Sequence, residues 1–135
     1  MVFQTSIWQD VEQSDRRIES KETTFEFVQR HPEMNDVRNF VDVTLHQLPT
    51  EARRLDAVQR MKSRRHHQFV DVLFELFIFS HVIDCGFAVA DHDGPDVYVP
   101  GEFAVEATVC HSPKYGDYHE YLMMGRVVLS GGKLP

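Results

Sequence analysis

Hydrophobic and polar residues follow two different periods along this chain. The strongest helical pattern runs from His66 to Asp84, where apolar residues recur three and four positions apart and Gly86 ends the run. The apolar stripe consists of Phe69, Val72, Leu73, Leu76, Phe79 and Ile83. Phe74, Phe77 and Ile78 cover much of the remaining surface. A helix that is apolar on most sides is typical of one buried between two layers.

Shorter helical patterns precede this helix. We expect helices over residues 7–18, 23–30, 36–48 and 49–63. Pro32 closes the second of these helices, because the residue before a proline is pushed out of the α region. Pro49 is expected just inside the start of the fourth, where a missing amide proton costs nothing.

After Gly86 the pattern changes to a period of two with many β-forming residues. It predicts strands over 87–92, 96–99 and 102–110, joined by turns at 93–95 and at Pro100-Gly101. The last part of the chain predicts a short helix over 117–124 and a short strand over 126–129. The order of these elements indicates an α+β fold with the sheet packed against the helix at 66–84.

Composition narrows the class of protein. The 135 residues are 42% hydrophobic and 26% charged, with ten Phe, which is typical of a globular domain and excludes wholesale disorder. The net charge of −7 excludes a surface that is basic throughout, although a local basic patch is compatible with it. Two cysteines cannot build a disulfide framework or a four-thiolate zinc site.

The chain also lacks the signals of secretion or membrane insertion. Its first ten residues do not join a basic stretch to an apolar one, and the apolar run at 72–83 is too short to span a bilayer. We therefore expect a cytoplasmic protein with no membrane partner.

Three acidic residues stand among apolar or β-forming neighbours. Glu75 lies within the apolar helix, Asp96 opens a predicted strand and Glu106 lies inside the next one. Pairing of those strands through the Pro100-Gly101 turn would bring Asp96 and Glu106 together, and adjacent carboxylates repel each other unless a cation neutralises them. Mg²⁺ is the usual cation, since it takes carboxylates, water and phosphate oxygens. Each residue also has a structural explanation: Glu75 reaching solvent or pairing with an Arg, Asp96 in a turn, and Glu106 facing solvent.

A family resemblance joins these residues. Pro95-Asp96, followed after nine residues by Glu106-Ala107-Thr108, resembles the PD-(D/E)xK motif of the restriction-endonuclease-like superfamily. Residues 23–110 further resemble a bacterial branch with a Phe-Glu-Leu helix, here at 74–76, and a Glu-Ala-Thr or Glu-Cys-Thr motif.

The resemblance implies a restriction-endonuclease-like αβββαβ core over 66–135 with an N-terminal helical extension over 1–65. It implies that Asp96, Glu106 and Glu75 bind Mg²⁺ (or Mn²⁺), and that the protein hydrolyses phosphodiester bonds in nucleic acid, in DNA rather than RNA. A homodimer is left open.

Thr108 occupies the position where the superfamily has lysine. A hydroxyl cannot stabilise developing negative charge as an ammonium can. Some relatives supply the lysine from the following helix, and Lys114 is the basic residue nearest to the motif before Arg126. The alternative is a catalytically inactive protein of the same fold that binds nucleic acid or protein.

A basic segment precedes the apolar helix. Between residues 53 and 67 a single acid, Asp56, stands among six basic residues. They are Arg53, Arg54, Arg60, Lys62, Arg64 and Arg65. These residues are candidates for contacts with nucleic-acid phosphates, and a solvated helix face is the alternative interpretation.

Overall fold

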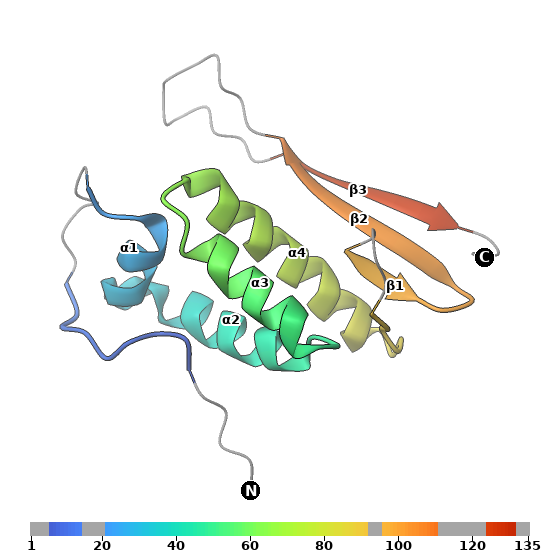
Figure 1. Cartoon of the computed structure of the whole chain (residues 1–135), viewed down its shortest axis with the longest axis horizontal. Helices are drawn as coiled ribbons and strands as arrows, with labels where there is room; N and C mark the ends of the chain where they lie inside the picture. The colour runs from blue at the N-terminus through green and yellow to red at the C-terminus, as the bar shows by residue number, and fades with distance from the viewer. Residues whose placement is uncertain (1–5, 15–20, 92–95, 111–123, 132–135) are drawn as a thin grey trace, which may run out of the picture. The chain divides into compact units, whose positions relative to one another are not determined.

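The computed structural model describes residues 6–14, 21–91, 96–110 and 124–131 (Figure 1). The described residues form four α-helices, one short 3-10 helix and three strands, which is a mixed α+β fold. In chain order the elements are α1 (Thr24–Arg30), η1 (Pro32–Met34), α2 (Asn35–Gln47), α3 (Glu51–Met61), α4 (His66–Asp84), β1 (Val97–Val99), β2 (Phe103–Cys110) and β3 (Met124–Gly131).

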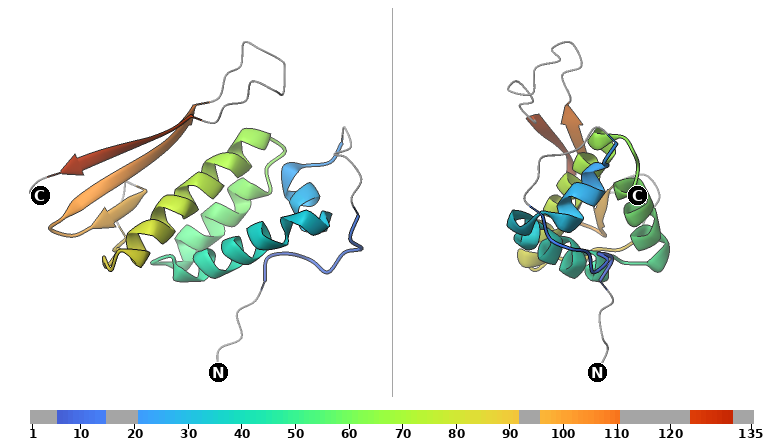
Figure 2. Two further views of the ribbon diagram at one scale, coloured as in Figure 1. Left: turned by 180° about the vertical axis from the view of Figure 1, so that it is seen from behind. Right: turned by 90° about the vertical axis from the view of Figure 1, so that its left-hand side faces the viewer.

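The chain divides into two compact units, Met1–Val72 and Leu73–Pro135. The division falls inside α4, so this helix contributes its first residues to one unit and the rest to the other. The boundary expected from the sequence, between residues 65 and 66, stays a prediction. In the first unit, α2 contacts both α1 and α3 (Figure 2).

Side-chain caps explain where the helices of the first unit begin. Thr23 accepts a hydrogen bond from the amide of Glu26, and Thr50 accepts one from the amide of Arg53, at 3.1 and 3.2 Å. Such caps satisfy amides that have no partner within the helix. The helices predicted over 23–30, 36–48 and 49–63 are confirmed to within about two residues at each end. Pro49 precedes the capping Thr50 instead of lying inside the helix.

The N-terminal segment differs from the sequence prediction. Residues 6–14 contain no helix, although the pattern predicts one over 7–18, and residues 15–20 lie outside the described part. Tertiary hydrogen bonds take the place of helical ones, because the amide of Ile7 donates to Asp42 at 3.2 Å and that of Ser14 to the carbonyl of Arg30 at 3.0 Å. The indole of Trp8 donates to the carbonyl of Arg38 at 3.1 Å.

A buried ion pair supports this segment. The guanidinium of Arg30, which is 8% exposed, donates to both carboxylate oxygens of Glu22 at 2.5 and 2.7 Å and to the carbonyl of Ser14 at 2.9 Å. A buried charge is tolerated only when it is paired and hydrogen-bonded, and this two-point pairing meets that condition.

The long helix α4 agrees with its predicted bounds, His66–Asp84. Gly86 follows with a φ of +91°, and its amide donates to the carbonyl of Ile83 while the amide of Phe87 donates to that of Val82. These two bonds form a Schellman motif, for which glycine is the favoured residue. Of the helices in the described residues, none is long and apolar enough to cross a membrane.

The sheet is antiparallel, with the strand order β1-β2-β3. The strands predicted over 96–99 and 102–110 correspond to β1 and β2, and the predicted strand 126–129 lies within the longer β3. The strand predicted over 87–92 is wrong for the residues described, up to Asp91, since only Ala90 makes a single bridge to Tyr98. The helix predicted over 117–124 lies outside the described residues, apart from Met124, which begins β3.

A tight turn sets the pairing of β1 with β2. The amide of Glu102 donates to the carbonyl of Val99 at 3.0 Å, and Gly101 between them has a φ of +78°. Pro at the second position and a left-handed Gly at the third are typical of a type II turn.

We expect Gly101→Ala to lower the free energy of unfolding by about 1–2 kcal/mol, because a side chain disfavours positive φ. No atom lies within 4 Å of the added Cβ, so backbone strain accounts for the loss. Urea denaturation measures it. Gly101→Asn is the matched control and should lose less, since Asn tolerates this conformation. Equal stability of the Ala variant and the wild type would contradict the left-handed conformation of Gly101 in this turn.

Candidate functional site

The register of the first two strands brings Asp96 and Glu106 together. Val97 pairs with Val105, so Asp96, one residue before β1, lies opposite Glu106 on β2. Residues opposite each other in an antiparallel pair have Cβ atoms about 4.5–5.5 Å apart. The sequence expectation that this turn places the two carboxylic residues side by side therefore follows from the observed register.

A backbone amide fixes the carboxylate of Asp96. The amide of Ala107 donates to Asp96 Oδ2 at 2.7 Å. Every second amide of β2 points toward β1. The Asp96 carboxylate therefore accepts a hydrogen bond from β2 just beyond the end of β1, where the backbone carbonyls of β1 no longer can. The bond is short, as expected for an ionised acceptor, and it holds the half-buried side chain of Asp96 beside Glu106.

Side chains alternate between the two faces of β2. Val105 is 1% exposed, whereas Glu106 and Thr108 on the opposite face are exposed. Glu106 is therefore open to solvent next to the fixed carboxylate of Asp96. If a hard divalent cation such as Mg²⁺ bound here, Asp96 and Glu106 would be its ligands, because Mg²⁺ is commonly bound by one or two carboxylates with water and phosphate oxygens as the other ligands.

Glu75 is half-buried on α4 and takes part in an interaction of its own. Among the residues that the structure describes, no three His, Cys, Asp or Glu side chains form a group that could hold a metal ion. The sequence assignment of Glu75 as a third ligand beside Asp96 and Glu106 stays a prediction. Lys114, the sequence candidate for the missing lysine, lies outside the described residues.

The first unit sorts the six basic candidates into two groups. Three of them serve the helices: Arg54 donates from Nε to the carbonyl of Leu45 at 3.1 Å, Arg60 lies 3.9 Å from Asp56, and Arg53 is half-buried with an interaction of its own. Arg54 and Arg60 therefore have partners within the chain, and Arg53 is not fully exposed.

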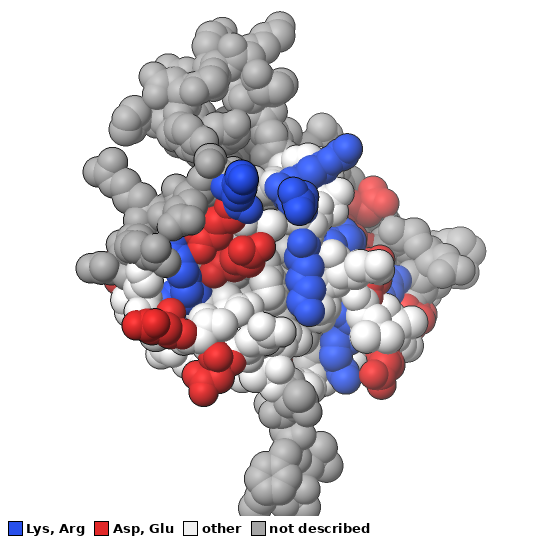
Figure 3. Space-filling model, turned by 60° about the vertical axis from the view of Figure 1, so that its left-hand side comes forward, with Lys and Arg blue, Asp and Glu red and all other residues white. Residues whose placement is uncertain are grey.

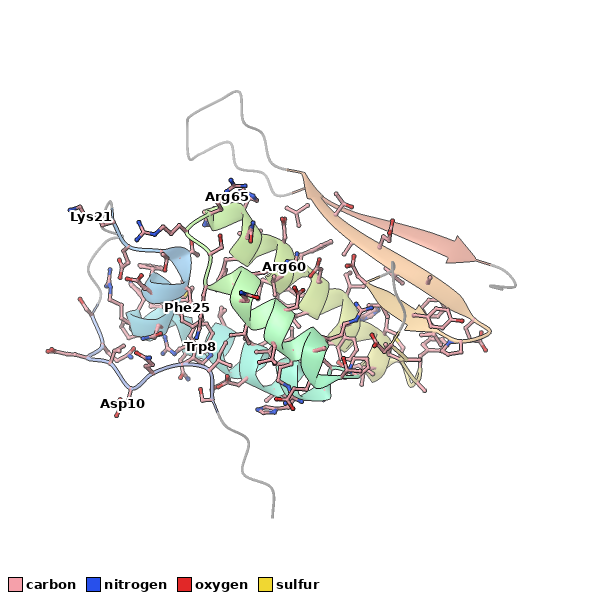
Figure 4. The ribbon with its side chains drawn as sticks, in the orientation of Figure 1. Trp8, Asp10, Lys21, Phe25, Arg60 and Arg65 are labelled. Atoms are coloured by element: carbon pink, nitrogen blue, oxygen red, sulfur yellow. The ribbon has the colours of Figure 1, made fainter. Side chains whose placement is uncertain are left out.

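The other three candidates, Lys62, Arg64 and Arg65, are exposed where α3 connects to α4. We call them the basic connection. The ammonium of Lys62 lies 5.5 Å from the ring centre of Phe25, a cation–π distance. Figure 3 shows Lys and Arg side chains gathered along one face with acidic side chains beside them, and Figure 4 places Arg65 at the start of α4.

The spacing of residues in the sequence did not predict the contacts around the basic connection. Phe25 stacks on Trp8, with ring centres 4.6 Å apart, and the hydroxyl of Thr24 shares a 2.7 Å hydrogen bond with Nδ1 of His66. These contacts tie α1 to the N-terminal segment and to the first residue of α4 (Figure 4). The partners are far apart in the sequence, so no local pattern could have identified them.

Comparison with models of protein families, with curated proteins and with solved structures finds no match to this chain.

Glu75 can be tested apart from the pair. We expect Glu75→Gln to lower the free energy of unfolding by about 1–3 kcal/mol, because a half-buried carboxylate loses its interaction, and to leave the affinity for Mn²⁺ unchanged. Thermal melts with and without Mn²⁺ measure both effects, and Glu102→Gln, an exposed acid in the turn, is the control. Higher metal-free stability combined with weaker Mn²⁺ binding would make Glu75 a third ligand.

Proposed function

We propose that this chain is a nuclease-like protein that uses Mg²⁺ or Mn²⁺ to hydrolyse phosphodiester bonds in nucleic acid, with DNA as the preferred substrate. The observation that supports the proposal is the juxtaposition of Asp96 and Glu106 across β1 and β2, with Asp96 held by the amide of Ala107. The resemblance of residues 95–108 to the PD-(D/E)xK motif supports the same function, together with an αβββαβ core.

Each residue of the pair has a distinct part in this proposal. Asp96 supplies a carboxylate whose position is fixed before the ion arrives, which lowers the cost of ordering it on binding. Glu106 supplies an exposed carboxylate that solvent, ion and substrate can all reach. A divalent ion held here would supply Lewis-acid catalysis and orient a phosphate oxygen.

The basic connection supplies the second part of the proposal, affinity for the nucleic-acid backbone. Lys62, Arg64 and Arg65 are exposed, in a chain whose net charge is −7. Basic side chains gain affinity for nucleic acid by releasing the counterions condensed on phosphates, so three of them favour binding independent of base sequence.

A second candidate function is favoured by Thr108. It is exposed on the same face as Glu106, at the position where the motif has lysine, and it brings no positive charge. The second candidate is therefore a protein of the same fold that binds nucleic acid or protein without cutting it. Both candidates share the basic connection, and only the first requires a divalent ion at Asp96 and Glu106.

A metal-binding and cleavage experiment separates the two candidates. We expect Mn²⁺ to bind in isothermal titration, and labelled DNA to be cut faster than RNA in its presence. Asp96→Ala and Glu106→Gln should each weaken Mn²⁺ binding by at least about tenfold and abolish cleavage, because each removes a charged ligand. Glu102→Gln removes an exposed acid of the same turn and should change neither. If the wild-type protein binds no Mn²⁺, the first candidate function, the metal-dependent nuclease, is wrong.

The basic connection gives an independent prediction. We expect Arg64→Gln with Arg65→Gln to weaken binding of duplex DNA and to reduce the slope of log affinity against log salt by about 0.9 for each phosphate that is no longer neutralised. Fluorescence anisotropy at several salt concentrations measures the slope. Arg60→Gln is the matched control, since Arg60 is already close to Asp56. An unchanged slope in the double variant would contradict a role for this segment in binding nucleic acid.

A further inference from the structure

A thiol and an imidazole lie in contact at the carboxyl-terminal end of α4. His81 is in the last turn of this helix and Cys85 follows the helix directly, with Sγ of Cys85 3.7 Å from Nε2 of His81. The amide of Cys85 also donates to the carbonyl of His81 at 3.0 Å, so the helical hydrogen bonding continues through this pair. Side chains four residues apart on a helix share one face, so the backbone itself brings the two groups together.

Both side chains are open to solvent. His81, Asp84, Cys85 and Gly86 are all exposed, and Cys85 is not part of a disulfide. A free cysteine is among the most often buried residues in proteins, because its thiol behaves as a small apolar group. Packing therefore does not explain Cys85, and its sulfur is accessible to an ion or a reagent.

The spacing of the two donor atoms matches what one tetrahedral metal ion requires. Zn²⁺ lies about 2.3 Å from a thiolate sulfur and about 2.0–2.1 Å from an imidazole nitrogen. At a tetrahedral angle, those two bonds place the sulfur and the nitrogen about 3.5 Å apart. The observed 3.7 Å differs from that spacing by about 0.2 Å, so an ion could bind both atoms with little rearrangement.

We propose that His81 and Cys85 bind a divalent transition-metal ion of the zinc type through Nε2 and Sγ. A thiolate and an imidazole select such ions, whereas carboxylates such as those of Asp96 and Glu106 suit Mg²⁺ and Mn²⁺. Binding requires a deprotonated thiol and a neutral imidazole, so the thiol proton passes to solvent. Neither Asp96 nor Glu106 takes part, so this site is independent of the proposed function.

The remaining coordination positions belong to water or to a molecule that the ion binds. Among the described residues, no third His, Cys, Asp or Glu completes a metal-binding group with this pair. Structural zinc sites are closed by four protein ligands, whereas catalytic sites keep a position open. We expect Zn²⁺ to half-saturate this two-ligand site at roughly 1–100 µM, because two ligands supply about half the binding free energy of a four-ligand site.

An ordinary structural role for the pair makes a different prediction. The contact would then be a weak hydrogen bond at the end of the helix, since sulfur is a poor donor and acceptor. In that case no metal ion would bind the thiolate or protect it from a reagent.

The test measures thiolate coordination directly in the full chain, kept reduced with a phosphine. Co²⁺ replaces Zn²⁺ as the probe, because a thiolate bound to Co²⁺ gives a charge-transfer absorption band in the near ultraviolet. We expect the wild-type protein to show this band and Zn²⁺ to displace it. Cys85→Ser should abolish the band, and His81→Ala should weaken Co²⁺ binding at least about tenfold, because the chelate loses its second donor. The matched controls are Cys110→Ser, at the other cysteine, and His67→Ala, at an exposed histidine of the same helix.

A second measurement on the wild-type protein needs no variant that must fold. Saturating Zn²⁺ should slow the alkylation of Cys85 by iodoacetamide at least about tenfold, because a metal-bound thiolate is a poor nucleophile, and should leave Cys110 unprotected. Peptide mass spectrometry assigns the alkylated residue.

Three results would overturn the site. They are no thiolate band in the wild-type protein, half-saturation by Zn²⁺ above about 1 mM, and a band that Cys110→Ser removes while Cys85→Ser leaves it. Titration with Mn²⁺ separates this site from the proposed function. If the wild-type protein binds no Mn²⁺, the proposed function is wrong and the site at His81 and Cys85 stands. If Cys85→Ser abolishes Mn²⁺ binding, the two sites are not independent and the assignment to His81 and Cys85 alone is wrong.

Discussion

The pairing of β1 with β2 decides where both carboxylates of the candidate site lie. Side chains in a strand alternate between faces, so a slip of one residue would move Glu106 to the buried face, where Val105 now lies. Two features of this unit hold the register. The type II turn at Gly101 sets it at one end, and the hydrogen bond from the amide of Ala107 to Asp96 sets it at the other. The same bond that aligns the strands also fixes one of the proposed ligands.

Charge is used differently in the two compact units. In the first unit some arginines bind other parts of the chain and others are exposed. Arg30 donates to Glu22 and to a backbone carbonyl, and Arg54 donates to a backbone carbonyl. Arg64 and Arg65 are exposed. In the second unit the exposed acid Glu106 lies beside a carboxylate fixed by the backbone. Composition alone could not separate structural from available charges, because the contacts that distinguish them are tertiary.

Local patterns predicted the elements that local physics determines. Helix α4 follows from its apolar periodicity and from Gly86, and β1 and β2 follow from alternation around the Pro-Gly turn. The helix expected over 7–18 fails in the described residues because Asp42 and Arg38 accept the hydrogen bonds of Ile7 and Trp8 from far along the chain. Alternation over 87–91 likewise cannot distinguish a paired strand from an extended segment with one bridge.

The candidate site could also be predicted only in part from the sequence. The proximity of Asp96 and Glu106 could be predicted, because a short turn joins their strands. The position of Arg126 opposite Thr108 could not, because 13 residues separate β2 from β3 along the chain, so no short turn predicts which of their residues pair.

The proposed function requires that Asp96 and Glu106 form one site for a divalent cation. Proton–nitrogen correlation spectra of labelled protein, recorded during a Mg²⁺ titration at constant ionic strength, test it most directly. We expect the amide signals of Asp96, Glu106 and Ala107 to shift most and to reach saturation together, because the ion redistributes charge on the carboxylate that Ala107 contacts. Saturable shifts centred on other residues, or no shift at these three amides, would contradict it.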